Sequence, residues 1–255
     1  MSLDEDFCFE EFADRVAELV EKHVNINRLL ELTKPVATAV VPISAGRHTY
    51  KREPSFPIAV ACDPAFNFVY EANIRYLHHL GEVTYFSPLA DTSLPDAGFV
   101  YLPGGYPELY LAALSANRQM LQSIRRYVES GGKLLAECGG MMYLCDEIRD
   151  KNGYVYPMAG VLHQSATMEN MKLRLGYRTL LYNETRLKGH EFHYSRLVEQ
   201  QNPLPSCAVA YTAKGVETDT PLYHYKNVWA GYTHLYWADP VGNEWFTKFV
   251  IDGNI

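Results

Sequence analysis

The sequence lacks the signals of several common classes of protein. It has no G-x-x-x-x-G-K-[ST] segment, and no G-x-G-x-x-G segment follows an expected strand, so it carries no recognisable nucleotide-phosphate site of its own. No apolar run approaches membrane-spanning length, which excludes a membrane partner of that kind. The formal net charge is −7 and no dense stripe of Lys and Arg is present, which argues against a nucleic-acid partner.

Cysteine is scarce as well. The five copies are odd in number and scattered without a C-x-x-C pair, so they indicate neither a disulfide framework nor a zinc knuckle. A reducing compartment fits this usage. Residues 1–11 are acidic, which excludes the basic start of a secretory signal, and we therefore expect a cytoplasmic protein. The cysteines are Cys8, Cys62, Cys138, Cys145 and Cys207.

The 255 residues suffice for one large domain with appendages. Apolar positions at helical spacing predict a helix over residues 7–32, which Thr33-Lys34-Pro35 ends, and residues 35–55 have the composition of a linker. From Phe56 onward, short apolar runs alternate with helical segments, which predicts a mostly parallel sheet covered by helices on both faces. Residues 154–235, rich in Tyr, Thr and Val, predict additional antiparallel strands. The expected strands include 57–61, 83–86, 99–102, 177–182, 207–211 and 228–232, and the expected helices are 65–80, 107–130 and 240–251.

Cys138 has the most informative setting in the chain. The residues from Gly131 to Leu144 read as a turn, a short apolar strand, a sharp corner and a helix, with Cys138 at the corner and two glycines after it. This pattern is typical of the nucleophile elbow of hydrolases, with sulfur in place of oxygen. A position at a helix start favours the thiolate. The alternative is a buried core cysteine, the usual place of a free thiol.

A cysteine nucleophile needs a base, and histidine serves near neutral pH. His234 follows a small apolar strand and precedes an aromatic cluster, so it is a candidate base or, alternatively, a core histidine. The segment Gly189-His190-Glu191-Phe192-His193-Tyr194-Ser195 offers His193 as a rival. Its histidines are three apart among strand formers, whereas zincins space them four apart on a helix, so we expect no metal site. Strand alternation instead puts Glu191 and His193 on one face.

A glycine pair ends another expected strand. Gly104 and Gly105 can aim backbone N–H groups at a developing oxyanion, with the Gly139 N–H as a second donor. An ordinary tight turn is the alternative reading of the same residues.

Four segments together resemble the glutamine amidotransferase domain of cobyrinic acid a,c-diamide synthase. The resemblance covers about residues 56–250 and implies a class I (triad-type), flavodoxin-like, three-layer α/β fold. It also implies three regions: 1–34 as the terminal helix of an absent ATP-binding synthetase domain, 35–55 as a linker, and 56–255 as the amidotransferase domain. The segments are Leu102–Glu108, Ala136–Leu144, Gly189–Ser195 and Tyr232–His234.

The resemblance assigns roles to residues. It implies that Cys138 attacks the glutamine side-chain amide to form a thioester and release ammonia, and that His234 is the base. Gly105 and Gly139 match its oxyanion-hole positions. Many such enzymes follow the histidine with Pro-Glu, whereas Leu235-Tyr236 follows here. The pair then acts as a dyad, or Glu191 orients His234 from the neighbouring strand. Tyr106, Arg174 and Arg178 are candidates for binding glutamine, with surface arginines as the alternative.

The resemblance also implies partners. The synthetase domain, with ATP and Mg²⁺, would phosphorylate the a and c acetate carboxylates of a corrin precursor, and ammonia would displace the phosphate. This chain would need no cofactor of its own, and its start would be artificial. The sequence leaves open whether the chain forms a homodimer.

Other functions remain open at this stage. Cobyric acid synthase has a related domain, but its corresponding motif more often reads like GYEIHMG than the GHEFHYS found here. Nickel-sirohydrochlorin a,c-diamide synthase would share nearly all of these motifs. A cysteine hydrolase or chaperone of the DJ-1 type also places a cysteine at such an elbow. In a non-catalytic docking module, Cys138 would be a vestige.

Overall fold

The computed structural model describes residues 9–33, 56–201 and 203–252, which fall into two units. The predicted linker at 35–55 and Cys8 lie outside these residues. The first unit consists of α1 (Phe9–His23) and α2 (Ile26–Leu32), where the sequence predicted one helix. The chain breaks at Asn25, whose side chain accepts a hydrogen bond from Arg28 N at 2.9 Å and caps α2.

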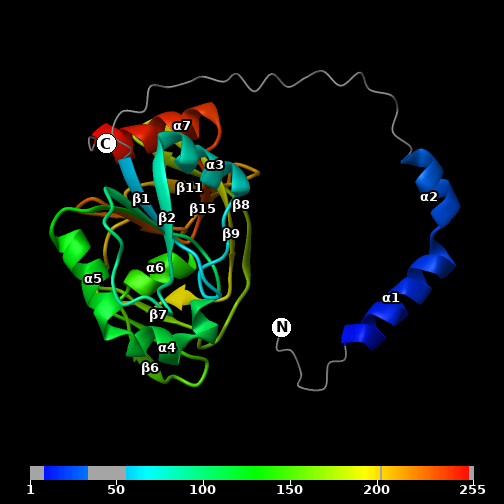
Figure 1. The fold of residues 1–255 in the computed structure, drawn as a ribbon, viewed down its shortest axis with the longest axis horizontal. Helices are drawn as coiled ribbons and strands as arrows, with labels where there is room; N and C mark the ends of the chain where they lie inside the picture. Colours follow the sequence, from blue (N-terminus) through cyan, green and yellow to red (C-terminus); the bar gives the residue numbers. More distant parts are fainter. Residues whose placement is uncertain (1–8, 34–55, 202, 253–255) are drawn as a thin grey trace. The chain divides into compact units, whose positions relative to one another are not determined.

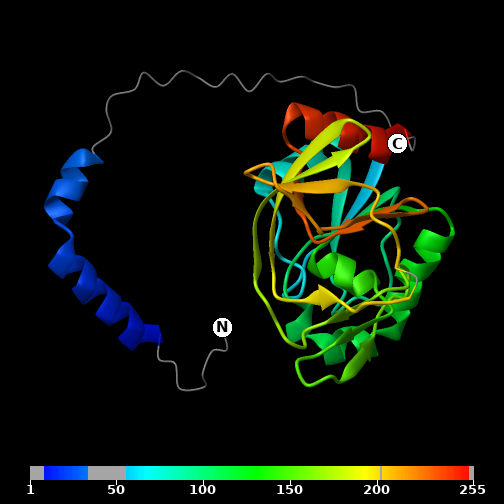
Figure 2. The ribbon, with the colours of Figure 1, turned by 180° about the vertical axis from the view of Figure 1, so that it is seen from behind.

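A six-stranded sheet forms the centre of the second unit (Figures 1 and 2). Its order is β13-β14-β4-β3-β1-β2, and all neighbours are parallel except β13 and β14. Every residue of β3 and β14 is buried, as expected of strands covered on both faces. The strands are β1 (Phe56–Ala61), β2 (Gly81–Phe86), β3 (Phe99–Leu102), β4 (Lys133–Glu137), β13 (Leu222–Tyr225) and β14 (Val228–Gly231).

Helices cover both faces of this sheet, which confirms the predicted three-layer α/β fold. One face packs against α4 (Leu111–Ala116), α5 (Arg118–Glu129) and α6 (Gly139–Leu144). The other packs against α3 (Glu71–Leu80), α7 (Pro240–Thr247) and the π-helical turn η2 (Lys248–Asp252). Figure 1 shows α3 and α7 close together, and the Tyr76 hydroxyl of α3 lies 2.5 Å from Thr247 Oγ1 of α7. None of the described helices is long and apolar enough to span a lipid bilayer.

Two predicted helices are shorter than expected. The helix predicted at 65–80 begins at Glu71, because Asp63 Oδ1 accepts from the N–H groups of Ala65 and Phe66 and holds a turn there. The helix predicted at 107–130 is divided into the 3₁₀ turn η1 (Pro107–Leu109), α4 and α5. Asn117 separates the last two because its carboxamide caps α5 and donates to Pro88 O and Asp91 O.

Two smaller sheets complete this unit. The five-stranded one is antiparallel throughout, has the order β12-β11-β8-β9-β15, and packs beside α3 and α7. Its strands are β12 (Glu217–Thr218), β11 (Val209–Thr212), β8 (Arg174–Tyr182), β9 (Thr185–His193) and β15 (His234–Tyr236). The four-stranded sheet comprises β10 (Arg196–Leu197), β7 (Ser165–Thr167), β5 (Glu147–Arg149) and β6 (Val155–Pro157).

The strand predicted at 228–232 ends at Gly231, and the chain then leaves the central sheet. It enters the five-stranded sheet at His234, where β15 pairs with β9. The transition puts His234 just beyond the carboxyl end of β14. Cys138 and Gly104-Gly105 follow the neighbouring strands β4 and β3, so all three segments meet at one edge, where ligands bind in open α/β sheets.

Candidate active site

The elbow at Cys138 is backbone-strained and firmly held. Cys138 has φ 47° and ψ −106°, a conformation that residues other than glycine rarely adopt. Its N–H donates to Gly231 O at 2.8 Å, and its carbonyl accepts from Met142 N at 3.0 Å. A Cβ on Gly140 would lie 2.1 Å from Leu102 O, so the second glycine allows α6 to approach β3. The sequence pattern of strand, corner and helix is therefore present.

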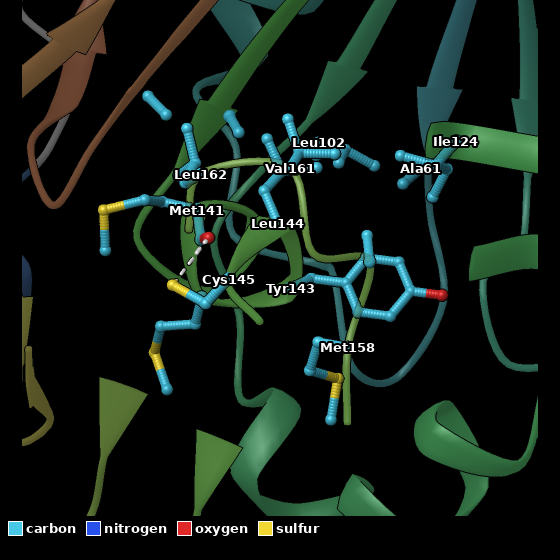
Figure 3. Close-up of a cluster of buried hydrophobic side chains, with 14 of the residues drawn as sticks. Ala61, Leu102, Ile124, Met141, Tyr143, Leu144, Cys145, Met158, Val161 and Leu162 are labelled. Atoms are coloured by element: carbon cyan, nitrogen blue, oxygen red, sulfur yellow. Dashed lines mark hydrogen bonds between the residues drawn. The ribbon is translucent and has the colours of Figure 1, made fainter. Parts of the chain in front are cut away.

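The helix behind the elbow is anchored in the core. Figure 3 shows Met141, Tyr143, Leu144 and Cys145 among other buried apolar side chains, and Cys145 Sγ bonds to Met141 O at 3.6 Å. All six residues of α6 are buried. This packing supports the strained corner from behind, which fixes the direction of the Cys138 side chain.

The thiol of Cys138 is protonated near neutral pH in this structure. Only 5% of the surface of Cys138 is exposed, and its Sγ lies 3.9 Å from Phe192 O. Burial raises the pKa of Cys138 to about 12, and the nearby carboxylate of Glu108 adds to the rise, whereas the N–H of Gly139 opposes it. The expectation of a favoured thiolate at a helix start was therefore wrong for this state, because loss of water outweighs the partial charge of a short helix.

The glycine loop after β3 lies against the elbow. Gly105 N is 3.3 Å from the position that a Cβ on Gly139 would take, so the two glycines lie close together. A side chain at Gly105 is excluded, since a Cβ would lie 2.2 Å from Ala65 O. The two residues expected to supply oxyanion N–H groups are thus neighbours; that role remains a prediction.

His234 packs on the same loop. A Cβ on Gly104 would lie 2.1 Å from His234 Cε1, so only glycine leaves room for the imidazole. His234 is buried, and Nδ1 has no hydrogen-bond partner within the described residues. Burial lowers the pKa of His234 to about 3, and the neighbouring His190 and His193 lower it further. The imidazole is therefore neutral near pH 7, which is the form that accepts a proton.

The strand that carries His234 is anchored by two buried polar residues that the sequence gave no reason to single out. Glu137 accepts from Leu235 N at 3.0 Å and from the Tyr101 hydroxyl at 2.6 Å. Asn73 donates to Leu235 O at 2.8 Å and accepts from Trp237 N at 3.1 Å. Burial raises the pKa of Glu137 to about 7, although the hydrogen bonds that Glu137 accepts from Tyr101 and Leu235 oppose the rise. The position of His234 is thus fixed through its backbone.

His190 faces His234, which sequence reasoning missed. The two residues are directly opposite across β9 and β15, and their rings stack with centroids 5.0 Å apart and planes 18° apart. The Tyr70 hydroxyl lies 2.5 Å from His190 Nδ1. Only the pairing of strands distant in sequence reveals the stack, because alternation along β9 cannot identify a cross-strand partner.

Glu191 lies on the opposite face of β9 from His190, together with His193, as alternation predicted. Glu191 Oε1 is 3.7 Å from His193 Nε2, and Oε2 is 2.6 Å from Arg178 Nε in an ion pair without hydrogen-bond geometry. Although burial pushes the pKa of Glu191 upward, the neighbouring polar groups of His193 and Thr220 and the charge of Arg178 hold it below its usual value. The structure therefore places Glu191 against His193 and Arg178, not against His234.

His193 lies between the Cys138 cavity and a second pocket. Its ring stacks on Tyr232 with centroids 3.8 Å apart, and Nδ1 is 2.9 Å from Ser195 O. It lines the small cavity that contains Cys138, and also a larger one of about 320 Å³. His193, the rival base, thus shares a cavity with the Cys138 thiol. Its ring, however, is already stacked on Tyr232.

The cavity beside the thiol is small, about 20 Å³, which is room for a water molecule. Tyr106, a predicted glutamine-binding residue, lines it. Arg174 and Arg178 do not; Arg174 pairs with Asp219 through both guanidinium N–H₂ groups, and Arg178 lies against Glu191. A ligand larger than a water molecule can enter the cavity beside the thiol only if the side chains that line this cavity move. The lining residues are Gly105, Tyr106, Glu108, Cys138, Met142, Phe192, His193, Tyr194 and Ser195.

No metal centre is built from the HEFH segment, since His190 and His193 lie on opposite faces of β9. Across residues 9–33, 56–201 and 203–252, no three His, Cys, Asp or Glu side chains are grouped to hold an ion.

Comparison with known families and proteins agrees with this geometry. Residues 57–241 match the CobB/CobQ-like glutamine amidotransferase domain. A cobyrinate a,c-diamide synthase of Picrophilus torridus is 37% identical over 236 residues, which cover 88% of this chain and 49% of that protein. A hydrogenobyrinate a,c-diamide synthase of Pseudomonas aeruginosa is 40% identical over 185 residues, covering 70% of this chain and 41% of that protein. The chain therefore spans about half the length of the curated relatives it matches.

Solved structures agree on the fold alone. One described as a glutamine amidotransferase superposes with a TM-score of 0.50 at 17% identity, covering 76% of this chain and 98% of that one. PurLQS from Thermotoga maritima superposes with a TM-score of 0.50 at 16% identity, covering 78% and 96%. The arrangement of layers and strands is thus shared with proteins of very different sequence.

Proposed function

This chain belongs to the family of CobB/CobQ-like glutamine amidotransferase domains, and we propose that it is the glutamine-hydrolysing half of a cobyrinate a,c-diamide synthase. The observation that carries the proposal is the convergence of the Cys138 elbow, the glycine loop and His234 at one edge of the central sheet. A nucleophile, backbone donors and a neutral imidazole are the groups that acyl transfer from an amide requires.

The chemistry follows from these positions. Cys138 transfers its proton to His234 and its sulfur attacks the side-chain carbonyl carbon of glutamine. The N–H groups of Gly105 and Gly139 stabilise the negative charge on the carbonyl oxygen. The C–N bond then breaks, ammonia leaves with the proton returned by His234, and a glutamyl thioester remains. Water hydrolyses the thioester to glutamate and regenerates the thiol.

The remaining half of such a protein would use the ammonia. The relatives are about twice as long as this chain, which leaves room in them for an ATP-binding synthetase domain. We propose that this domain, with ATP and Mg²⁺, phosphorylates the a and c acetate carboxylates of a corrin precursor, and that ammonia displaces the phosphate. We place the reaction in the cytoplasm. The relatives are named for cobyrinate or for hydrogenobyrinate, and we propose one of these two as the acceptor.

The cheapest test is labelling with the diazoketone analogue of glutamine, which alkylates an amidotransferase nucleophile. We expect one adduct on Cys138, found by peptide mass spectrometry, and protection by excess glutamine. The described thiols Cys62, Cys145 and Cys207 serve as internal controls and should remain unlabelled. Absence of any adduct on Cys138 would contradict glutamine hydrolysis and favour a hydrolase of the DJ-1 type or a docking module.

His190 should act by positioning His234. We expect His190→Ala to lower the rate of glutamine hydrolysis by up to about tenfold, because a stacked aromatic pair contributes about 0.5–1.5 kcal/mol. His190→Phe keeps a ring against His234 and should retain most of the activity, although it loses the contact with Tyr70. The pH profile of hydrolysis should move in His190→Ala more than in His190→Phe. Equal loss in both variants would instead assign the effect to the hydrogen bond with Tyr70.

A further inference from the structure

Among the described residues, Glu108 is the one carboxylate that lines the cavity beside the Cys138 thiol, and none of them lines it with a Lys or Arg side chain. It lies in η1, directly after the glycine loop. η1 contacts the elbow, since a Cβ on Gly139 would lie 2.7 Å from Pro107 Cδ. Glu108 is thus brought to the thiol by the same two segments that form the predicted oxyanion site.

Two other carboxylates near Cys138 already have partners. Glu137 accepts hydrogen bonds from Tyr101 and Leu235, and Glu191 lies against Arg178 and His193. Glu108 differs, because no Lys, Arg or His among the described residues forms an ion pair with it. Burial raises the pKa of Glu108, and a backbone hydrogen bond opposes the rise without a cationic side chain to assist it. The cavity is therefore suited to a small cation.

Glutamine carries one cation, its α-ammonium group. On the basis of the proposed function, we propose that Glu108 binds this ammonium and so selects glutamine over amides that lack an α-amino group. A charge-assisted hydrogen bond from ammonium to a partly buried carboxylate is among the stronger recognition contacts. Glu108 is then a specificity-determining residue, and the reacting atoms remain those of Cys138 and His234.

The same contact would activate the nucleophile. In the free protein, burial and then the charge of Glu108 raise the pKa of Cys138, so thiolate accumulates only at alkaline pH. An ammonium bound to Glu108 cancels that charge and makes removal of the thiol proton easier. The thiol would thus become reactive when a substrate with an α-amine enters, and it would stay protonated otherwise.

Two alkylating agents test the proposal, because they should respond to Glu108→Gln in opposite directions. The diazoketone analogue of glutamine has an α-amine, and we expect it to label Cys138 about tenfold more slowly or worse in Glu108→Gln. Iodoacetamide has no amine, and at mildly alkaline pH we expect it to label Cys138 faster, since a charge that disfavours the thiolate is gone. Unfolding would also expose the buried Cys138 thiol to iodoacetamide, so Cys145, which is equally buried, is the internal check on folding. It should stay unlabelled in Glu108→Gln, which shows that the opposite responses arise in the folded protein.

Controls separate the outcomes. Glu108→Asp keeps the charge and should retain part of the preference for the diazoketone, whereas Glu184→Gln, an exposed change in the β8–β9 turn, should alter neither rate. If the diazoketone labels the wild-type chain and Glu108→Gln equally well, Glu108 does not bind the amine. If Glu108→Gln slows both reagents, its role is structural and the proposal is overturned. If the diazoketone does not label the wild-type chain at all, the proposed function itself fails.

Discussion

Replacing Cys138 by alanine should abolish glutamine hydrolysis and labelling by the diazoketone analogue. The expected loss is complete within detection, because Cys138 is the only described residue lining this cavity that stands at a strained strand-to-helix corner. The free energy of unfolding should change by about 1 kcal/mol or less, since the thiol is small and its one hydrogen-bond contact, with Phe192 O, is long at 3.9 Å. Glutamate release and a denaturant titration measure the two quantities.

Cys145→Ala is the matched control for that variant. Cys145 is also buried and lies at the end of α6, within the same core. Its removal should leave hydrolysis intact and cost stability through a small cavity. Persistent activity in Cys138→Ala, or complete loss in a folded Cys145→Ala protein, would show that the nucleophile has been assigned wrongly.

His234→Asn should reduce turnover by about 10²–10⁴-fold, the usual contribution of a positioned general base. His193→Asn should cost much less, because the His193 ring is stacked on Tyr232 and its Nδ1 is bonded to Ser195 O. Steady-state glutamate release gives both values. The reverse ranking would move the base from β15 to β9, to a histidine that lines the thiol cavity.

The low pKa of His234 also predicts how the effect of His234→Asn should depend on pH. Because burial lowers the pKa of His234 to about 3, the imidazole is neutral in mildly acidic as well as neutral solution, and its capacity to accept a proton should persist there. His234→Asn removes an acceptor without adding charge. Its effect should therefore be similar at pH values on both sides of the ordinary histidine pKa.

Much of the fold could be predicted from local sequence patterns. The parallel sheet and the helices on both faces were predicted from the alternation of apolar runs and helical segments, and the antiparallel strands from composition; the structure confirms them. The predicted helix boundaries were wrong where a local turn, or a hydrogen bond to a residue distant in sequence, replaces the helical hydrogen bonds. Asp63 holds residues 63–66 in a turn, and Phe68 N donates to Gly104 O, so the helix predicted from residue 65 begins only at Glu71.

The sequence by itself determined the elbow at Cys138, because a strand, a corner and two glycines are consecutive residues whose backbone conformations are set locally. It also determined that Glu191 and His193 share a face, since alternation along one strand is local too. Only the tertiary structure decided that His190 rather than Glu191 meets His234, and that Glu108 lies beside Cys138. It alone decided that the thiol is protonated, because a pKa depends on water and charges that packing removes or brings near.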